Sequence, residues 1–380
     1  MRAEIDPTIE RVVLRAADSE RVRSDTASVV EREDGTLLIA YHSYSHGPEG
    51  GGDFGAAKIY LAESDDGGRH WTNERMMADI VPGDLNVMTP FLCRWEDEIL
   101  FGYVRNHSPG DTSMHLHRSG DEGKSFGDST PIWEHAGEYR IQGGASSLVR
   151  LDSGRLVLPI QCCDEVWVAD ENQSIGTYLS DDGGRSWHPS ANRIGLPMRG
   201  AMEPSIAQRA DGSLLMSIRC QLGAVFLSES GDGGETWSRA RTSGLRSPES
   251  CTCLRRLPGS DDLILFWNDS EYVYDHHHLG TRSPLSAAVS GDGGQSWAKI
   301  GDIDSGDCML TNLGCTFTST GEAIVTYLKT PDPEIQNGVY RGTRSTKEER
   351  DAQFEMELAA ALIPKSWFSN RAVLIANTKG

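Results

Sequence analysis

Ser64-Asp-Asp-Gly-Gly-Arg-His-Trp71 is a turn motif that recurs along the chain, and its recurrence decides the fold. The pattern is Ser-x-Asp-x-Gly-x-x-aromatic, and the other copies are Ser119–Phe126, Ser180–Trp187, Ser230–Trp237 and Ser290–Trp297. Successive copies lie 55, 61, 50 and 60 residues apart, which suits one four-stranded sheet with its loops for each repeat. A period of this length predicts an all-β propeller.

The motif has a physical reason to be a turn. Its aspartate, for example Asp66, can accept backbone N–H bonds across a tight turn whose glycine permits an unusual φ. The aromatic residue is then expected to be buried between strands at the periphery. Each copy offers one well-placed carboxylate and lacks the alternating set that a calcium loop needs. We therefore expect the repeats to be structural and to bind no metal ion.

A second repeat gives the number of blades. Each blade should contain an apolar strand, a tight turn and another apolar strand, and this pattern occurs six times, at 27–41, 90–104, 146–160, 204–218, 251–267 and 313–328. Six hairpins with five turn motifs predict a six-bladed β-propeller whose last blade lacks the motif and is completed by strands from both ends of the chain. Pairing the ends would also cover sheet edges. We expect residues 1–380 to form a single domain.

Composition excludes several classes of function. The formal net charge of -20 argues against nucleic acid or an anionic membrane as a partner, because both need a basic surface. No run of roughly 18 apolar residues is present and residues 1–9 carry charges, so we expect no membrane span, no signal peptide and a cytoplasmic location. The eight cysteines form no pair of Cys-x-x-Cys motifs, which favours reduced, buried thiols over zinc binding. We expect no cofactor.

The five motifs are Asp boxes, and a family resemblance rests on them and on two further segments. These are Glu203-Pro-Ser-Ile-Ala-Gln208 and Arg282-Ser-Pro-Leu-Ser-Ala-Ala288. Together they make nearly the whole chain similar to the sialidase (neuraminidase) superfamily. The resemblance implies that three arginines hold a sugar carboxylate, that a tyrosine paired with a glutamate attacks the anomeric carbon, and that a loop aspartate is the acid/base. Asp boxes lie far from the axis, so function depends on inner-strand residues.

Four residues match this pattern. Glu203, Arg219 and Arg282 follow one another in the order and spacing that resemble the family's glutamate and its second and third arginines. Asp53, in the glycine-rich loop 50–55, resembles the acid/base aspartate. We therefore expect Asp53 and Glu203 to be catalytic and both arginines to bind substrate.

The first arginine and the tyrosine do not match. Ser24-Asp25 stands where the first arginine belongs, so a shift in register would use Arg23, or Arg140 would replace it from the start of the third inner strand. The segment 310–315 begins the sixth inner strand and contains no tyrosine. We therefore expect little turnover of simple aryl sialosides, and either direct attack by water or elimination.

Three functions remain open. The first is an exo-acting glycosidase on an acidic sugar, with an acidic mono- or oligosaccharide as the partner. The second is a lyase that acts on a uronic acid through a Tyr or His base. The third is a glycan-binding propeller without catalysis. The candidate bases are His42, His107, Tyr139, Tyr272, Tyr274 and the run His276–His278, which we expect to be a solvated loop. Trp167 either lines a sugar subsite or packs at the rim.

Overall fold

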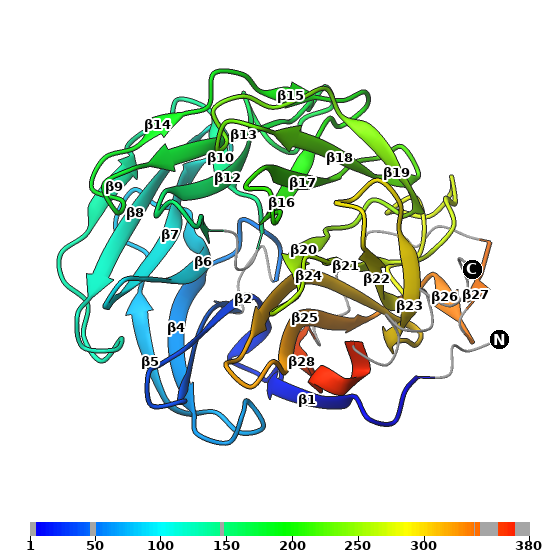
Figure 1. Cartoon of the computed structure of the whole chain (residues 1–380), viewed down its shortest axis with the longest axis horizontal. Helices are drawn as coiled ribbons and strands as arrows, with labels where there is room; N and C mark the ends of the chain where they lie inside the picture. The colour runs from blue at the N-terminus through cyan, green and yellow to red at the C-terminus, as the bar shows by residue number, and fades with distance from the viewer. Residues whose placement is uncertain (1–4, 46–50, 145–147, 338, 343–355, 369–380) are drawn as a thin grey trace.

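The strands form six antiparallel sheets around a central axis (Figure 1). The computed structural model describes residues 5–45, 51–144, 148–337, 339–342 and 356–368. In the first five sheets along the chain, the first strand lies closest to the axis and the following strands step outward; in the sixth, the innermost strand is Cys308–Phe317. The prediction of a six-bladed all-β propeller is confirmed.

The chain builds the blades in order. Blade 1 holds β2 (Arg21–Glu31), β3 (Leu37–Ser45), β4 (Ala57–Ser64) and β5 (Thr72–Ala78), and blade 2 holds β6 (Asn86–Trp95), β7 (Glu98–Ser108), β8 (Asp111–Ser119) and β9 (Thr130–Trp133). Blade 3 holds β10 (Tyr139–Gln142), β11 (Val149–Arg150), β12 (Leu156–Cys163), β13 (Ser174–Ser180), β14 (His188–Pro189) and β15 (Ile194–Gly195). Blade 4 holds β16 (Met202–Gln208), β17 (Leu214–Arg219), β18 (Ala224–Ser230) and β19 (Arg241–Arg246), and blade 5 holds β20 (Cys253–Arg256), β21 (Leu263–Asn268), β22 (Leu285–Ser290) and β23 (Ala298–Asp304).

Blade 6 closes the ring with both ends of the chain, as predicted. Its strand order is β24 (Cys308–Phe317), β25 (Ala323–Pro331), β28 (Glu357–Ile363) and β1 (Glu10–Arg15). The N-terminal strand β1 therefore covers the outer edge of the C-terminal strand β28. A small hairpin of β26 (Ile335–Gln336) and β27 (Val339–Tyr340) stands beside this blade.

The hydrophobic core lies between neighbouring blades. Each large cluster of buried apolar side chains joins two adjacent blades; for example, Leu215 and Leu227 of blade 4 pack with Leu254 and Trp267 of blade 5. A further cluster joins blade 6 to blade 1, where Leu362 packs with Leu37. Both faces of a central strand such as β12 are covered by neighbouring blades. All of its residues are therefore buried, and buried and exposed positions do not alternate along it. The ring is held by inter-blade packing on all sides.

The Asp boxes connect the third and fourth strands of blades 1 to 5. In the first box Gly68 donates its N–H to Ser64 Oγ (2.9 Å), and Asp66 Oδ1 accepts the N–H groups of Arg69 (3.0 Å) and His70 (2.9 Å). These backbone donors hold the pKa of Asp66 well below its ordinary value. Blade 6 has no box because its third and fourth strands, β28 and β1, come from opposite ends of the chain.

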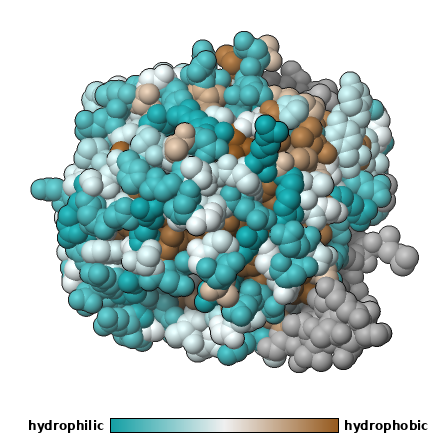
Figure 2. Space-filling model, turned by 45° about the horizontal axis from the view of Figure 1, so that its top comes forward, coloured by the Kyte–Doolittle hydropathy of each residue, from teal (hydrophilic) through white to brown (hydrophobic). Residues whose placement is uncertain are grey.

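The box aromatics are less buried than expected. Trp237 is fully buried, whereas Trp71, Phe126, Trp187 and Trp297 are half-buried at the periphery. All eight cysteines are buried and none forms a disulfide. The surface in Figure 2 is largely hydrophilic, with apolar residues exposed in separate small areas. In the described part of the chain, no helix has the length and apolar character needed to cross a membrane.

Candidate active site

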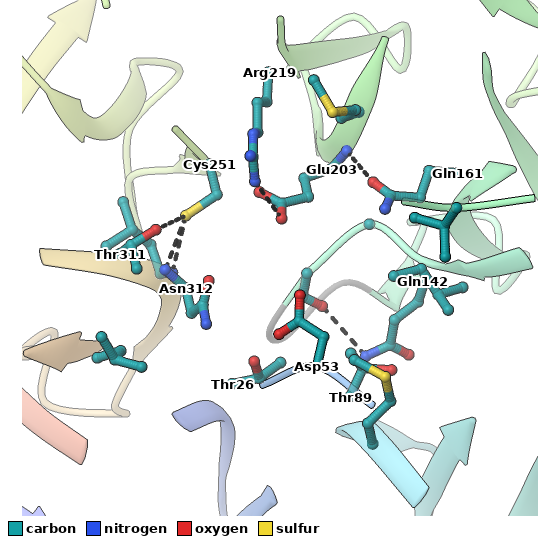
Figure 3. Close-up of a pocket in the computed structure, with 18 of the residues that line it drawn as sticks. Thr26, Asp53, Thr89, Gln142, Gln161, Glu203, Arg219, Cys251, Thr311 and Asn312 are labelled. Carbon is teal, nitrogen blue, oxygen red and sulfur yellow. Dashed lines mark hydrogen bonds and ion pairs between the residues drawn. The ribbon is translucent and has the colours of Figure 1, made fainter. Parts of the chain in front are cut away.

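A cavity of about 270 Å³ lies where the inner strands of the blades meet. All six blades contribute to its walls (Figure 3). Its lining includes polar side chains from each blade, namely Thr26, Thr89, Gln142, Glu203, Thr252 and Asn312. The propeller therefore brings together residues that are far apart in the sequence; Thr26 and Asn312, for example, are 286 positions apart.

Four inner strands contain the same backbone distortion. Thr26, Thr89, Glu203 and Asn312 have φ values of +46°, +49°, +40° and +56°, and at each of them the pairing with the next strand shifts in register. A β-bulge of this kind turns a side chain away from the regular alternation. A positive φ is uncommon for residues other than glycine, and inside a strand it is a strained conformation that the surrounding structure must hold. All four side chains line the cavity.

Three arginines surround one buried glutamate on the cavity wall. Glu249 Oε1 accepts hydrogen bonds from Arg199 Nη1 and from Arg219 Nη2 (2.9 Å), while Arg282 donates Nε (3.1 Å) and Nη2 (2.8 Å) to the Glu249 carbonyl oxygen. Burial alone would raise the pKa of Glu249, but Arg219 and Arg199 lower it to about 2. Glu249 therefore holds the arginine cluster together as a carboxylate.

Glu203 is tied to this cluster through Arg219. Arg219 Nη1 donates to Glu203 Oε1 (2.8 Å), and Gln161 Oε1 accepts the backbone N–H of Glu203 (2.6 Å), as Figure 3 shows. Within the described residues, Glu203 Oε2 and Arg219 Nε are buried and have no hydrogen-bond partner. Buried polar atoms normally have partners, so these two atoms are unsatisfied groups in the described structure.

Arg282 is the most desolvated arginine of the cluster. It is 6% exposed, and burial together with the neighbouring Arg219 lowers the pKa of its guanidinium to about 10. Its Nε and Nη2 atoms are used by the Glu249 carbonyl oxygen. No described residue accepts a hydrogen bond from its Nη1, and the side chain lines the cavity.

A second charged group is centred on Asp25. Arg23 donates Nε to Asp25 Oδ2 (2.8 Å) and Nη1 to Asp53 Oδ1 (2.7 Å), and Asn312 donates Nδ2 to Asp25 Oδ2 (2.5 Å). Asp25 is fully buried. Burial alone would raise its pKa, but Arg23 and His42 hold it far below the ordinary value. Asp25 is therefore a carboxylate that only accepts hydrogen bonds.

The charged group around Asp25 fixes the orientations of the His42 ring and of the Asn312 side-chain amide. His42 Nδ1 accepts the N–H of Thr89 (3.0 Å), so the ring's proton lies on Nε2, which contacts Asp25 Oδ1. Asn312 must direct its NH₂ group at Asp25, so its Oδ1 points away from that carboxylate. No described residue donates to Asn312 Oδ1, and the side chain lines the cavity. Asn312 thus presents a hydrogen-bond acceptor to a ligand.

Among the described residues of the sixth inner strand and its surroundings, no side chain is placed as a nucleophile. Cys251 Sγ accepts the N–H groups of Asn312 (3.0 Å) and Leu313 (3.4 Å), and burial raises the pKa of its thiol. Thr311 Oγ1 contacts the same sulfur at 3.5 Å. Tyr327 is buried in the core, and its hydroxyl donates to Asp304 (2.9 Å). None of these groups is placed as an activated nucleophile.

Five of the six predicted site residues line the cavity: Arg23, Asp53, Glu203, Arg219 and Arg282. Arg140 does not, and its expected place at the axis is wrong. It donates to Glu138 Oε1 (Nη2, 2.5 Å) and to the hydroxyl of Tyr178 (Nη1, 2.8 Å). Successive side chains of a strand point to opposite faces; the cavity is lined by Tyr139 and Ile141, the neighbours of Arg140 in β10.

The run of three histidines is not the expected solvated loop. His276 is buried, His277 packs on it with ring centres 4.6 Å apart, and His278 lines the cavity. Ligand atoms of His276, His277 and Asp332 lie within 4.8 Å of one another. However, His276 Nδ1 accepts the N–H of His278 (3.1 Å), which leaves the proton of the neutral ring on Nε2 and argues against that atom as a metal ligand.

Comparison with known proteins places the chain in a family. A family model described as "BNR repeat-like domain" matches residues 29–354. The chain belongs to this family. This BNR protein is a sialidase-like propeller, and no curated protein has a sequence that matches it significantly.

Solved structures share the fold at low sequence identity. A protein of unknown function from Dyadobacter fermentans DSM 18053 is 17% identical with a TM-score of 0.70, and the match covers 94% of this chain and 100% of that one. The Hadza microbial sialidase Hz136 is 22% identical with a TM-score of 0.66, covering 83% of this chain and 65% of its own. Trypanosoma rangeli sialidase with 2,3-difluorosialic acid is 15% identical with a TM-score of 0.71, covering 98% and 61%. The BNR protein thus spans less than two thirds of the length of both sialidase chains.

Proposed function

We propose that this BNR protein is a glycoside hydrolase that removes a terminal acidic sugar. One observation carries the proposal: the axial cavity contains two carboxylates, Asp53 and Glu203, together with the guanidinium groups of Arg219 and Arg282. A pair of carboxylates in different surroundings can divide the acid and base roles of glycoside hydrolysis. The likeness of the fold to sialidases supports the same class of reaction.

Arg282 is the residue that we assign to the substrate carboxylate. Arg219 already serves Glu203 and Glu249, whereas Arg282 lines the cavity and its Nη1 has no acceptor among the described residues. A guanidinium binds a carboxylate through charge-assisted hydrogen bonds that are strong in a desolvated site. An acidic sugar would therefore bind with its carboxylate on Arg282.

Water is the attacking group in this proposal. Glu203 Oε2 has no partner within the described residues and can take a proton from water. The oxygen of that water forms the new bond to the anomeric carbon while the glycosidic bond breaks. The leaving oxygen takes the proton of the Asp53 carboxyl group, whose side chain is 36% exposed and takes up that proton from solvent, and Glu203 afterwards returns its own to solvent. Because no covalent intermediate forms, the anomeric configuration is inverted.

Arg282→Ala tests the binding half of the proposal. We expect the variant to bind an acidic monosaccharide about 100-fold more weakly than the wild type, because a desolvated charge pair is lost. Titration calorimetry measures this with glucuronic acid and with N-acetylneuraminic acid. Arg140→Ala is the matched control, since its guanidinium pairs with Glu138 outside the cavity, and it should bind as the wild type does. Equal affinity in the two variants would refute the assignment.

A second candidate reaction is β-elimination on a uronic acid, and His278 is the observation that favours it. Its ring lines the cavity, and no described residue makes a hydrogen bond to either ring nitrogen. Burial and the nearby Arg282 lower the pKa of His278 well below its ordinary value. A neutral imidazole beside a carboxylate-binding arginine can remove the proton on the carbon that bears the carboxylate.

The two reactions leave different products from a glucuronate-containing oligosaccharide. Elimination gives an unsaturated sugar that absorbs in the near ultraviolet, and hydrolysis gives none. Under our proposal, we expect sugar release without this absorbance. The rate of release in His278→Gln should stay within about threefold of the wild-type rate. If absorbance appears and His278→Gln lowers its rate by about 10²-fold or more, elimination is the reaction. Binding without any product would indicate a propeller that only binds glycans.

A further inference from the structure

Trp167 is an exposed aromatic residue at the edge of the cavity. Its side chain lines the cavity, and the residue is 59% exposed. Its φ of +65° is a strained backbone conformation for an aromatic residue. An exposed and strained tryptophan persists only when the surrounding structure holds it in place.

Glu171 supplies that support. Its carboxylate is buried. Oε2 of Glu171 accepts the backbone N–H of Trp167 (2.8 Å), and Oε1 accepts hydrogen bonds from Gln173 Nε2 (2.5 Å) and Arg199 Nη2 (2.8 Å). The guanidinium of Arg199 lies over the indole ring, with its central carbon 5.2 Å from the ring centre. One face of the ring is thus occupied by Arg199, and more than half of the residue's surface, 59%, remains exposed.

The two segments that form this edge are joined to each other. Gln173 donates its N–H to the carbonyl of Arg199 (2.8 Å), and Ala201 donates to the carbonyl of Gln173 (2.9 Å). Gly200 lies so close to the Gln173 backbone that a Cβ would overlap it. Arg199 also reaches Glu249, which holds Arg219. A continuous chain of ion pairs therefore fixes Trp167 relative to the arginine cluster.

We propose that Trp167 is a second sugar subsite, which stacks on an uncharged pyranose joined to the acidic sugar. Apolar C–H faces of a pyranose pack on aromatic rings, and Trp167 offers an exposed aromatic side chain at the edge of the cavity. Arg199 is already used by Glu171 and Glu249, so it provides no spare positive charge for a second carboxylate. The inference rests on the proposed function and narrows its substrate to an acidic sugar at the end of an oligosaccharide.

The test compares a monosaccharide with its conjugate. Titration calorimetry is done in the Glu203→Gln background, which keeps the ligand intact. It compares the affinity for N-acetylneuraminic acid with that for sialyllactose, and the affinity for glucuronic acid with that for a glucuronosyl-glucose disaccharide. We expect the conjugate to bind about tenfold more tightly than the monosaccharide, as one aromatic stacking contact would give. Trp167→Ala should remove this preference and leave the affinity for the monosaccharide within about twofold. Trp167→Phe should keep part of the preference.

Tyr274→Ala is the matched control, because Tyr274 is another exposed aromatic (79%) that does not line the cavity. It should keep the full preference. If the monosaccharide binds but the conjugate is no tighter, or if Trp167→Ala keeps the preference, the second subsite is refuted and the proposed function stands. If neither monosaccharide binds, the proposed function fails, and the subsite with it.

Discussion

Glu203→Gln is expected to lower kcat for hydrolysis of an acidic glycoside by about 10²–10⁴-fold, the contribution of a general base. The amide cannot take a proton from water. Its oxygen can still accept the hydrogen bond from Arg219, which Glu203 Oε1 accepts at 2.8 Å in the wild type. The arginine cluster should therefore keep its arrangement, and KM should change by less than about threefold. Steady-state kinetics on the best substrate of a panel of acidic glycosides measures both constants.

Glu138→Gln is the matched control for this variant. Glu138 accepts hydrogen bonds from Arg140 and Arg193 outside the cavity, so kcat should stay at the wild-type value. Proton NMR of the first product formed by the wild type should show the inverted anomer. A retained anomer would contradict direct attack by water and would indicate a covalent intermediate on a side chain. An unchanged kcat in Glu203→Gln would exclude this residue from the chemistry.

The second large effect concerns stability. Glu249→Gln is expected to lower the free energy of unfolding by about 3–5 kcal/mol, because removing one member of a buried ion-pair group leaves charges uncompensated. Glu249 is 3% exposed, and its carboxylate serves both Arg199 and Arg219. Urea unfolding at pH 7 measures the change. As a control, Glu271→Gln removes a partner of Arg246. The Glu271 side chain is 80% exposed, so the free energy of unfolding should fall by less than about 1 kcal/mol.

Glu249 should also make the free energy of unfolding depend on pH. Its pKa is about 2 in the folded protein against an ordinary value of 4.5, so the stabilisation is present above pH 4.5 and is lost as the pH falls through 2. It contributes about 3 kcal/mol at neutral pH. The loss of stability between pH 5 and pH 2 should therefore be smaller in Glu249→Gln than in the wild type. Parallel curves for the two proteins would contradict this explanation.

The fold could be predicted from the sequence because its signals are local. Each Asp box closes within eight residues, as in Ser64–Trp71, and each inner hairpin has its own turn. Even the missing sixth box has a simple cause, since no chain segment connects β28 to β1. Burial of the box aromatics was overestimated because it depends on contacts with the neighbouring blade.

The site was predicted only in part because its contacts join distant segments. Glu249 and Arg199 come from loops between strands, and no sequence pattern places them against Arg219. Arg140 was assigned to the axis because the alternation along β10 cannot be fixed without its pairing, which sets Arg140 opposite Cys162. His278 was assigned to solvent because its loop is held against Glu249, whose N–H donates to the His278 carbonyl (2.9 Å), and no sequence pattern shows this contact. The bulge at Glu203 had a weak signal, a charged residue directly before Pro204 in the inner strand β16.

Because of the bulges in the inner strands, four of the residues that line the cavity are distinct from the residues that hold the blades together. Thr26, Thr89, Glu203 and Asn312 are placed by their backbone, while the inter-blade cores are built from other residues. A substitution at one of these four positions changes what the cavity offers a ligand without removing a core contact. Propellers of this kind can therefore acquire new reactions through few mutations, and a combinatorial library limited to these positions is the direct way to select them.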